Sequence, residues 1–355
     1  MTTLLDRLGL SLPIVQAPMA GTSTPALAAA VSNAGGLGSI GLGAAGTERG
    51  RAMIDAVRQQ TERAFNVNVF CHQPARPEPA REAAWTARLQ PEFARYGAEP
   101  PARLTEIYTS FLVDAAMQAL LVEARPAVVS FHFGLPSAEI IAALKGAGCV
   151  LFASATSLDE GRAAEAAGCD AVVAQGWEAG GHRGVFDPDA PDDQLGTFAL
   201  TRLLVRGLGV PVIAAGGIMD GAGVAAALTL GAVAAQLGTA FVGCAETDAD
   251  QGYRTALASG ANQHTTMTRA ISGRPARSLA NRFTALGQAE GAPPPAYPIA
   301  YDAGKALNAA AKAEGEFGWG AQWAGQAAPL SRPMPAAELM TVLRAELAAV
   351  DARWG

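Results

Sequence analysis

The sequence predicts an α/β fold, a TIM (β/α)8 barrel with a second, mainly helical domain. Eight short apolar runs alternate with alanine-rich helical stretches, and eight βα units in succession are typical of this barrel. None of the runs alternates apolar with polar residues, as expected of parallel strands covered on both faces. A doubly wound sheet is the structural alternative, but its G-x-G-x-x-G fingerprint is absent after the first run, where Ala-Pro-Met-Ala-Gly stands at 17–21.

The predicted elements follow from the apolar runs and from helix caps between them. Thr24 has the position of an N-cap, with Pro25 in the first helical turn and Gly35-Gly36 after the helix. Ser157 and Glu160 have the spacing of a capping box. The predicted strands are 13–17, 37–40, 66–70, 127–131, 150–153, 171–174, 211–215 and 234–237. Helices are expected at about 25–33, 47–62, 114–123 and 197–207, with Ser137 and Asp220 as the N-caps of two more.

Two segments interrupt the alternation and predict the second domain. Residues 72–112 carry six prolines, yet they are too long and too rich in helix-forming residues for a bare loop. Residues 248–327 read as irregular helix and are expected to pack with that insertion. The predicted division is 1–71 and 114–247 for the barrel, 72–113 and 248–327 for the helical domain, and 328–355 for a closing helix, at 335–352, that returns to the barrel.

Composition excludes several classes of function. The net charge of −6 and the pI near 5.3 argue against a nucleic-acid surface. No apolar run reaches the roughly 18 residues that span a bilayer, and residues 1–12 have no secretory h-region. The four cysteines are far apart without a C-x-x-C pair, which disfavours a disulfide framework or a zinc site. We expect a cytoplasmic protein, monomer or homodimer, that acts on a small molecule without nucleic acid, membrane or metal.

In a barrel, the working residues follow the carboxyl ends of the strands. After the seventh and eighth predicted strands lie Gly216-Gly217 and the run Gln236-Leu237-Gly238-Thr239. Loops at these two positions bind phosphate through backbone N–H groups in many barrels, although the glycines alone are also consistent with simple turns. Asn68 and Gln175 are amides at strand ends that suit the edges of a heterocycle, or serve as structural hydrogen bonders.

The loop 174–184 carries the clearest candidate for proton transfer. It reads Ala-Gln-Gly-Trp-Glu-Ala-Gly-Gly-His-Arg-Gly, so backbone can approach a bulky ligand, and His182 can move protons near neutral pH. His132 follows the fourth strand and is a second catalytic candidate or a wall of the pocket. His72 and His264 lie outside the strand-end pattern and are assigned structural roles. The three lysines do not follow strands, which disfavours a Schiff-base aldolase.

Tyr297, Tyr301 and Lys305 recur every four residues, so on a helix they share one face. Such a face predicts a lid that binds an anionic substrate, and the alternative is an ordinary amphipathic surface. Pro298 makes an irregular first turn the expectation.

Four motifs together resemble class I nitronate monooxygenases, formerly called 2-nitropropane dioxygenases. They are QAPMAGTSTPALAAAVSNAGGLGSI at 16–40, VSFHFG at 129–134, AQGWEAGGHRG at 174–184, and PVIAAGGI at 211–218 followed by Asp220-Gly221. Each motif alone is shared with related FMN barrels, but the set in this order is specific and spans essentially the whole chain.

The resemblance implies an FMN enzyme that oxidises alkyl nitronates, propionate 3-nitronate among them, with O2 to a carbonyl compound and nitrite, through a flavin semiquinone and without NAD(P)H. It also agrees with a pocket lined by tyrosine and lysine. Its active-site histidine falls on His182. The FMN-binding residues expected from the motifs and their glycines are Met19, Gly21, Thr22, Ser23, Asn68, Gln175, Gly180, Gly181, Gly216, Gly217, Gln236, Leu237, Gly238 and Thr239.

Two alternatives remain open at this point. An NAD(P)H-dependent FMN reductase of the enoyl-thioester or quinone type would use the same barrel. A protein of another class, a non-catalytic phosphate-ligand barrel or a flavin-free isomerase, would need no flavin chemistry.

Overall fold

The computed structural model describes residues 3–354 and shows a TIM barrel. Its parallel sheet has the order β1-β9-β8-β6-β5-β4-β3-β2, and a bridge between Val15 and Leu37 joins the two end strands. The eight predicted strands are confirmed. They are β1 (Ile14–Gln16), β2 (Gly38–Gly41), β3 (Phe65–Phe70), β4 (Val128–His132), β5 (Val150–Ala155), β6 (Ala171–Gln175), β8 (Val212–Ala215) and β9 (Ala234–Leu237).

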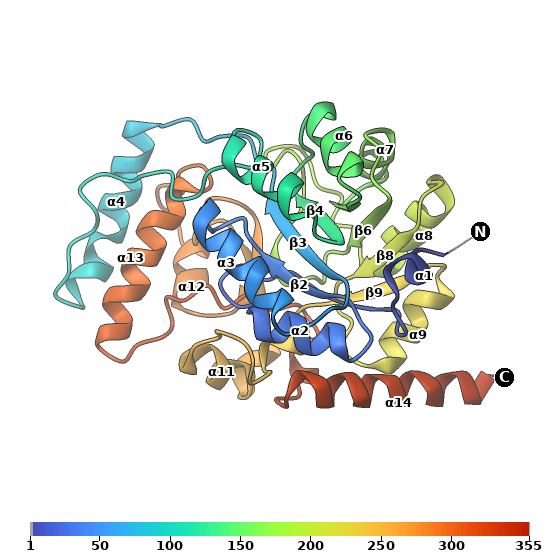
Figure 1. Cartoon of the computed structure of the whole chain (residues 1–355). Helices are drawn as coiled ribbons and strands as arrows, with labels where there is room; N and C mark the ends of the chain where they lie inside the picture. The colour runs from blue at the N-terminus through green and yellow to red at the C-terminus, as the bar shows by residue number, and fades with distance from the viewer. Residues whose placement is uncertain (1–2, 355) are drawn as a thin grey trace.

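Helices cover the outside of the barrel (Figure 1). They are α2 (Pro25–Asn33), α3 (Thr47–Arg58), α5 (Ala115–Ala124), α6 (Ala138–Gly146), α7 (Leu158–Ala166), α8 (Thr197–Gly207), α9 (Gly221–Thr229) and the closing α14 (Ala336–Trp354). Thr24, Ser137, Ser157 and Asp220 accept hydrogen bonds as the predicted N-caps. The capping box at Ser157 does not form, because the Glu160 carboxylate accepts instead from Thr156 and from the amide of Phe186.

Side chains that point into the barrel change character along its axis. Towards the amino ends of the strands, Val15, Val128, Phe152 and Ile213 form a packed core. The short helix α1 (Leu4–Leu8), which the sequence analysis did not identify, adds Leu8 to this core and covers that end of the barrel. Towards the carboxyl ends the inward residues are polar or small, and the barrel opens into a cavity.

The second lobe joins chain segments that are far apart in the sequence. It contains α4 (Pro79–Ala94), α11 (Gln251–Leu257), α12 (Arg282–Gln288) and α13 (Ile299–Ala313), together with two 3-10 helices, η1 (Gly260–Gln263) and η2 (Ala328–Leu330). Trp85 and Phe93 from α4 share a core with Phe283 and Leu307, and α4 and α13 lie side by side on the left of Figure 1.

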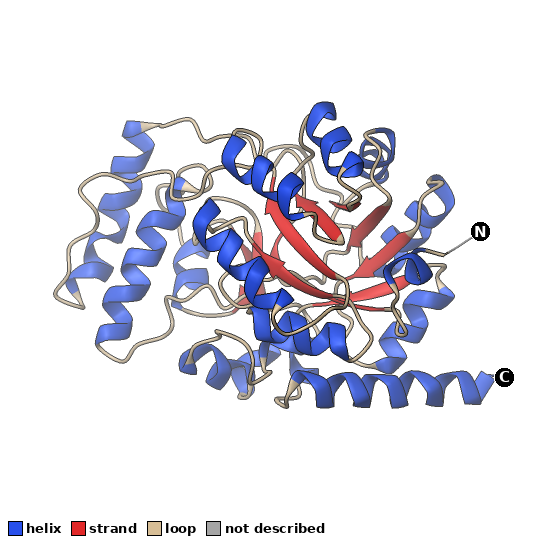
Figure 2. Ribbon diagram, in the orientation of Figure 1, coloured by secondary structure: helices blue, strands red, loops and turns tan. Residues whose placement is uncertain are grey.

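The segment 248–327, expected to be irregular helix, also contains strands. This segment supplies β10 (Thr265–Thr268) and β11 (Ala276–Leu279), which pair in antiparallel fashion with each other, and β11 also pairs with β7 (Gly181–His182) from the barrel loop. Figure 2 shows these strands beside the helices of the lobe. Four-residue strands have little periodicity of their own, and the β7 partner of β11 is far away in the sequence, so no local pattern predicts this sheet. Within the described residues, no helix combines the length and the hydropathy needed to cross a membrane.

Candidate active site

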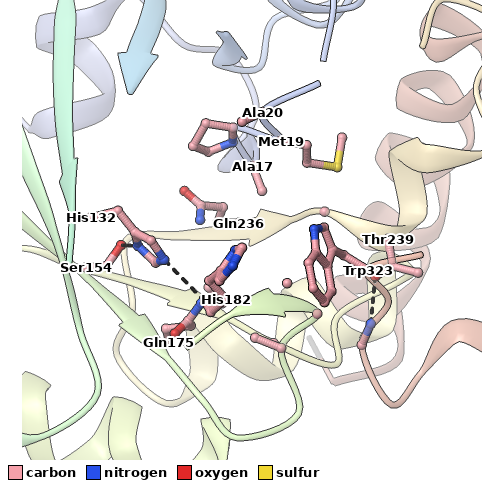
Figure 3. A pocket seen from close by; sticks show the side chains of 18 of the residues that line it. Ala17, Met19, Ala20, His132, Ser154, Gln175, His182, Gln236, Thr239 and Trp323 are labelled. Atoms are coloured by element: carbon pink, nitrogen blue, oxygen red, sulfur yellow. Dashed lines mark hydrogen bonds between the residues drawn. The ribbon is translucent and has the colours of Figure 1, made fainter. Parts of the chain in front are cut away.

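An open cavity lies where the carboxyl ends of the barrel strands face the second lobe. Its empty volume is about 1360 Å³, counted with the solvent space at its mouth. The barrel contributes strand ends and glycine-rich loops, and the lobe contributes an aromatic wall. Figure 3 shows His182 and Trp323 close together inside it, with Met19 and Gln236 above them. A deep cavity with a few convergent polar groups is typical of a small-molecule site.

The backbone of His182 is fixed from two sides. Its carbonyl oxygen accepts from His132 Nε2 at 3.2 Å and from Gln175 Nε2 at 2.9 Å. Gln175 Oε1 accepts in turn from the amide of Gly184 at 2.6 Å. Gly181 has φ +76°, which disfavours any residue with a Cβ. The loop therefore holds the imidazole at one place in the cavity.

Arg183 anchors the outer part of the same loop. Its buried guanidinium pairs with Asp192 at 2.8 and 3.0 Å and also donates to the carbonyl of Gln175. A buried charge is stable only when it is paired and hydrogen-bonded, and here the carboxylate and the carbonyl meet that need. This contact ties the start of the loop to the segment that leads into α8.

The imidazole of His182 has one occupied and one free nitrogen. Nε2 lies 2.9 Å from Ser272 Oγ, and within residues 3–354 Nδ1 has no hydrogen-bond partner. The ring meets Trp323 and Tyr297 at centroid distances of 5.0 and 5.4 Å. Burial, followed by the charges of His132, Arg274 and His72, lowers the pKa of His182 to about 3. The side chain is therefore a neutral imidazole at pH 7.

His132 has both ring nitrogens occupied. Nε2 faces the carbonyl of His182, which only accepts, so Nε2 carries the hydrogen and Nδ1 accepts from Ser154 Oγ at 2.9 Å. Burial is the main cause that lowers the pKa of His132 to about 4. These contacts favour a structural role for His132, in which it lines the cavity and positions His182, and they do not favour a role as the proton acceptor.

His72 lies closer to the site than its position in the sequence suggests. It is buried, its ring meets that of Tyr297 edge-on at 4.9 Å, and neither ring nitrogen has a partner in the part of the chain that the structure describes. Burial, followed by the charge of Arg274, lowers its pKa to about 4. His72 therefore belongs to the polar surroundings of His182, whereas His264 is exposed.

A buried cation, Arg274, lies close to the histidines at 72, 132 and 182. The guanidinium of Arg274 lies 4.2 Å above the ring of Phe133 and donates to backbone carbonyls of 185 and 186, without a carboxylate partner among the described residues. Phe133 itself has φ +75°, a conformation that costs a residue with a Cβ roughly 1–2 kcal/mol. Strain of this kind persists where the surrounding structure enforces it, often at functional sites.

Most of the predicted ligand-binding residues meet in the cavity. Those that line it are His132, His182, Tyr297, Tyr301, Met19, Thr22, Asn68, Gln175, Gly180, Gly181, Gly216, Gly217, Gln236, Gly238 and Thr239. Gly21, Ser23 and Lys305 line a second, adjoining cavity. The side chain of Leu237 packs into the core beneath the helices, so only its backbone is available to a ligand. The hydroxyl of Ser23 stabilises the turn before it, by accepting from Gln16 and from the amide of Met19.

One end of the cavity is formed mainly by backbone. Gly217 has φ +70°, and a Cβ on Gly180 would lie 2.5 Å from Ala324 and Gly325. Thr239 Oγ1 accepts from the amide of Gly325 at 3.0 Å and begins the short helix α10 (Thr239–Val242). Within the described chain, no backbone acceptor takes the amides of Gly217 and Gly238. Free amides with little side chain around them fit a phosphate group.

Amide side chains are available elsewhere on the cavity wall. Asn68 gives its Nδ2 to Ser130, at 3.1 Å to the carbonyl and 3.0 Å to the hydroxyl, which leaves Oδ1 as an acceptor. Gln236 also lines the cavity. Gln175, in contrast, uses both ends of its amide to hold the loop of His182.

The second lobe supplies the aromatic wall, and much of it was missed from sequence. Tyr108, Trp323 and Gly325 line the cavity, and Ser272 contacts His182. They come from irregular segments that carry no local signal for a site. The predicted stripe of Tyr297, Tyr301 and Lys305 is helical only in part, because α13 begins at Ile299, after Tyr297. Tyr297 still reaches the site, from the turn before the helix.

The fold and the cavity define the class of the protein, a TIM barrel with a small-molecule site at the carboxyl ends of its strands. The model of the nitronate monooxygenase family matches residues 2–346. The chain belongs to this family of oxidoreductases.

Individual relatives agree over almost the whole length. A nitronate monooxygenase of Paraburkholderia phytofirmans is 66% identical over 345 residues, which covers 97% of this chain and 94% of that protein. A solved structure of nitroalkane oxidase from Streptomyces ansochromogenes has a TM-score of 0.91 at 42% identity, covering 98% of this chain and 99% of that one. FabK from Thermotoga maritima is similar at a TM-score of 0.74 and 29% identity, with 100% and 98% covered.

Proposed function

We propose that this protein is an FMN-dependent nitronate monooxygenase that oxidises alkyl nitronates, including propionate 3-nitronate, with O2 to a carbonyl compound and nitrite. One observation carries the proposal most strongly: a neutral imidazole, His182, has a free nitrogen in a cavity whose far end is built from glycine backbone. Membership of the nitronate monooxygenase family supports the reaction class.

The residues around the cavity fit FMN. The amides of Gly217 and Gly238, with the start of α10, would hold the phosphate. The Oδ1 of Asn68 and the amide of Gln236 would meet the edges of the ring system. When bound, FMN supplies the redox centre that accepts electrons from the nitronate.

His182 provides the acid–base chemistry. With the hydroxyl hydrogen of Ser272 directed to the carbonyl of Arg274, which lies at 3.3 Å, His182 Nε2 donates to Ser272 and Nδ1 keeps its lone pair. Nδ1 would then accept the α-proton of a neutral nitroalkane, a step that such positioned groups accelerate by roughly 10²–10⁴. Burial, followed by nearby charges that include Arg274, lowers the pKa of His182 and so keeps the imidazole in the neutral form that can accept a proton.

The aromatic wall and Lys305 would select the substrate. Tyr108, Tyr297 and Tyr301 cover the cavity and reduce its contact with water. The ammonium of Lys305 lies 4.7 Å above the ring of Tyr108, at the border of the adjoining cavity, where it would attract a substrate carboxylate.

Absorption spectroscopy tests the proposal directly. The purified protein should show a flavin spectrum, and anaerobic mixing with propionate 3-nitronate should bleach it, whereas NADH and NADPH should not. A colourless protein that stays inactive after FMN is added would remove every flavin-based function.

The second candidate is an NAD(P)H-dependent FMN reductase on the same barrel. The likeness to FabK favours keeping it, since a protein with a different name shares the architecture at a TM-score of 0.74. Rapid anaerobic bleaching by NADPH alone would make this candidate the better one.

A further inference from the structure

The closing helix α14 packs against the part of the barrel that follows β8. It lies beside α9 at the lower right of Figure 1. A Cβ on Gly221, the first residue of α9, would lie 2.4 Å from the Cβ of Glu346 and from the backbone nitrogen of Leu347, so the two helices meet without a side chain between them. The chemistry proposed for the cavity makes no use of α14.

The loop between β8 and α9 contains part of the proposed phosphate-binding backbone. Gly216 and Gly217 have φ +119° and +70°. Thr197 Oγ1 donates to the carbonyl of Gly216 at 2.9 Å, and the amide of Thr197 donates to the carboxylate of Glu178 at 2.8 Å, so the start of the loop is held from the barrel side. Glycine loses more conformational freedom on ordering than any other residue, so a loop of this kind binds a ligand more tightly when other contacts fix it beforehand.

An ion pair between Arg332 and Glu346 holds the other end of the loop. Arg332 Nη2 donates to the carbonyl of Met219 at 2.9 Å, and Nη1 pairs with Glu346 Oε1. Glu346 Oε2 accepts from the amide of Gly221 at 2.9 Å. These two backbone groups flank Asp220, which is the N-cap of α9. The pair therefore fixes the backbone at the point where the loop enters the helix.

The chemistry of the pair suits this local task. Hydrogen bonds with a charged partner are about twice as strong as neutral ones, and Met219, whose carbonyl accepts one of them, also lines the cavity. The side chains of Arg332 and Glu346 remain 28% and 34% exposed, and ion pairs exposed to this degree contribute little to overall stability. We therefore expect that removing the pair loosens the loop and leaves the fold intact.

We propose that Arg332 and Glu346 are positioning residues for the cofactor, because they fix the loop after β8 in the conformation that presents the amide of Gly217 to the phosphate of FMN. Neither side chain lines the cavity, so both act through the backbone at 219 and 221. The helix that ends the chain thereby sets the affinity for FMN. This inference rests on the proposed function for the identity of the ligand.

Titration of the apoprotein with FMN and with riboflavin, which lacks the phosphate, tests the inference through flavin fluorescence. Arg332→Ala and Glu346→Ala should each raise the Kd for FMN about fivefold and the Kd for riboflavin less than about twofold, because only the phosphate depends on the loop. The double variant should lose about as much affinity as either single variant, since the two residues act as one unit. Arg344→Ala is the matched control on α14, where Arg344 donates to the carbonyl of Ala34 at 2.9 Å, and it should bind both flavins as the wild type does.

Hydrogen–deuterium exchange of the apoprotein provides a measurement without flavin. The amides of 216–223 should exchange faster in Arg332→Ala than in the wild type and in Arg344→Ala. An unchanged Kd for FMN in Arg332→Ala and Glu346→Ala, or an equal loss of affinity for FMN and riboflavin, would overturn the positioning role. A wild-type apoprotein that binds neither flavin would overturn the proposed function instead, and the exchange rates would still decide whether the ion pair orders the loop.

Discussion

His182 and His132 are only 50 positions apart and line one cavity, but their hydrogen bonds assign them different tasks. Both ring nitrogens of His132 form hydrogen bonds, one with Ser154 and one with the backbone carbonyl of His182. His182 keeps one nitrogen free. Sequence position alone makes both histidines catalytic candidates, and only the hydrogen-bond partners separate them.

Replacing His182 tests its proposed role as the base. His182→Asn should retain FMN, because the backbone of the loop is held through the carbonyl and not through the ring. Its kcat/KM should fall by roughly 10²–10⁴ with neutral nitroalkanes, and less with preformed nitronates. Steady-state kinetics with nitroethane and ethyl nitronate measure the difference, and the exposed His264→Asn serves as control. Unchanged turnover of nitroethane would exclude His182 as the base.

The low pKa of His182 also predicts the pH dependence of that step. A base with a pKa of about 3 stays neutral through pH 5–7. We therefore expect kcat/KM for a neutral nitroalkane to show no acidic limb near pH 6.5, the usual pKa of histidine. A pH–rate profile from pH 4.5 to 8 measures this, and a limb centred at 6.5 would contradict the buried, neutral state.

Several residues around His182 give no signal in the sequence. Ser272, Arg274 and Trp323 come from the second lobe, and no spacing connects them to the loop at 174–184. His72 follows β3 within two residues, so a wider definition of the strand end would have included it. Buried hydrogen-bond partners of this kind emerge only when the two lobes are assembled.

Among the elements, α13 borders both cavities, because Tyr301 lines the two of them and Lys305 lines the second. Lys305→Met removes the charge but keeps a chain of similar length. It should raise KM for carboxylated nitronates several-fold more than KM for simple alkyl nitronates, because a single charge acts mainly on the charged substrate. Lys145→Met is a control on α6, where Lys145 contacts the carbonyl of Gly168. Equal changes in KM for both substrate classes would argue against an anion-binding role of Lys305.

The glycine-rich loop after β8 offers a prediction about FMN affinity. Gly217 has φ +70°, so Gly217→Ala would strain the loop by roughly 1–2 kcal/mol, which corresponds to about a tenfold loss of FMN affinity. Flavin fluorescence on titration of the apoprotein measures the Kd. Gly146→Ala is the matched control, since its new Cβ meets nothing within 4 Å. An unchanged Kd in Gly217→Ala would place the phosphate elsewhere.

At the scale of helices and strands, the sequence predicts the barrel well and the second lobe less well. The eight barrel strands are apolar runs bounded by turns, and their helices carry visible caps such as Thr24 and Asp220. β10 and β11 have no such signal, because each has only four residues, and β11 also pairs with β7, nearly 100 positions away. The irregular first turn that Pro298 predicts is present, because α13 begins at Ile299, after Tyr297.

For the whole molecule, one buried and two half-buried histidines link stability to pH. The pKa values of His72, His132 and His182 are about 4, 4 and 3, below the usual 6.5. The unfolded chain therefore binds more protons than the native one as the pH falls below 6.5, and stability present above that pH is lost towards pH 4.

Thermal unfolding measures this effect. Tm should decrease steadily from pH 7 to pH 4.5, and the decrease should be smaller in His72→Phe, where one of the three groups no longer titrates. A Tm that is independent of pH over this range in the wild type would contradict the neutral, buried cluster.

The overall division into a barrel and a second lobe is visible in the sequence, because the insertion at 72–112 breaks a regular alternation. The way in which the two parts meet is not visible. Arg88 of α4 donates to carbonyls of 286 and 289, 198 and 201 positions away. Contacts between residues so far apart in the sequence depend on the folded arrangement of the two parts, and no local sequence pattern predicts them.

The two residues of β7 form the third strand of the lobe's small sheet while they carry the imidazole of the barrel. The imidazole of His182, which we propose as the base, is thus connected to both halves of the molecule, and a rotation of the lobe relative to the barrel would displace it. The proposed reaction therefore requires that the barrel and the lobe keep a fixed relative position. A cross-link between them should leave turnover unchanged, whereas substitutions that loosen their contact should reduce it.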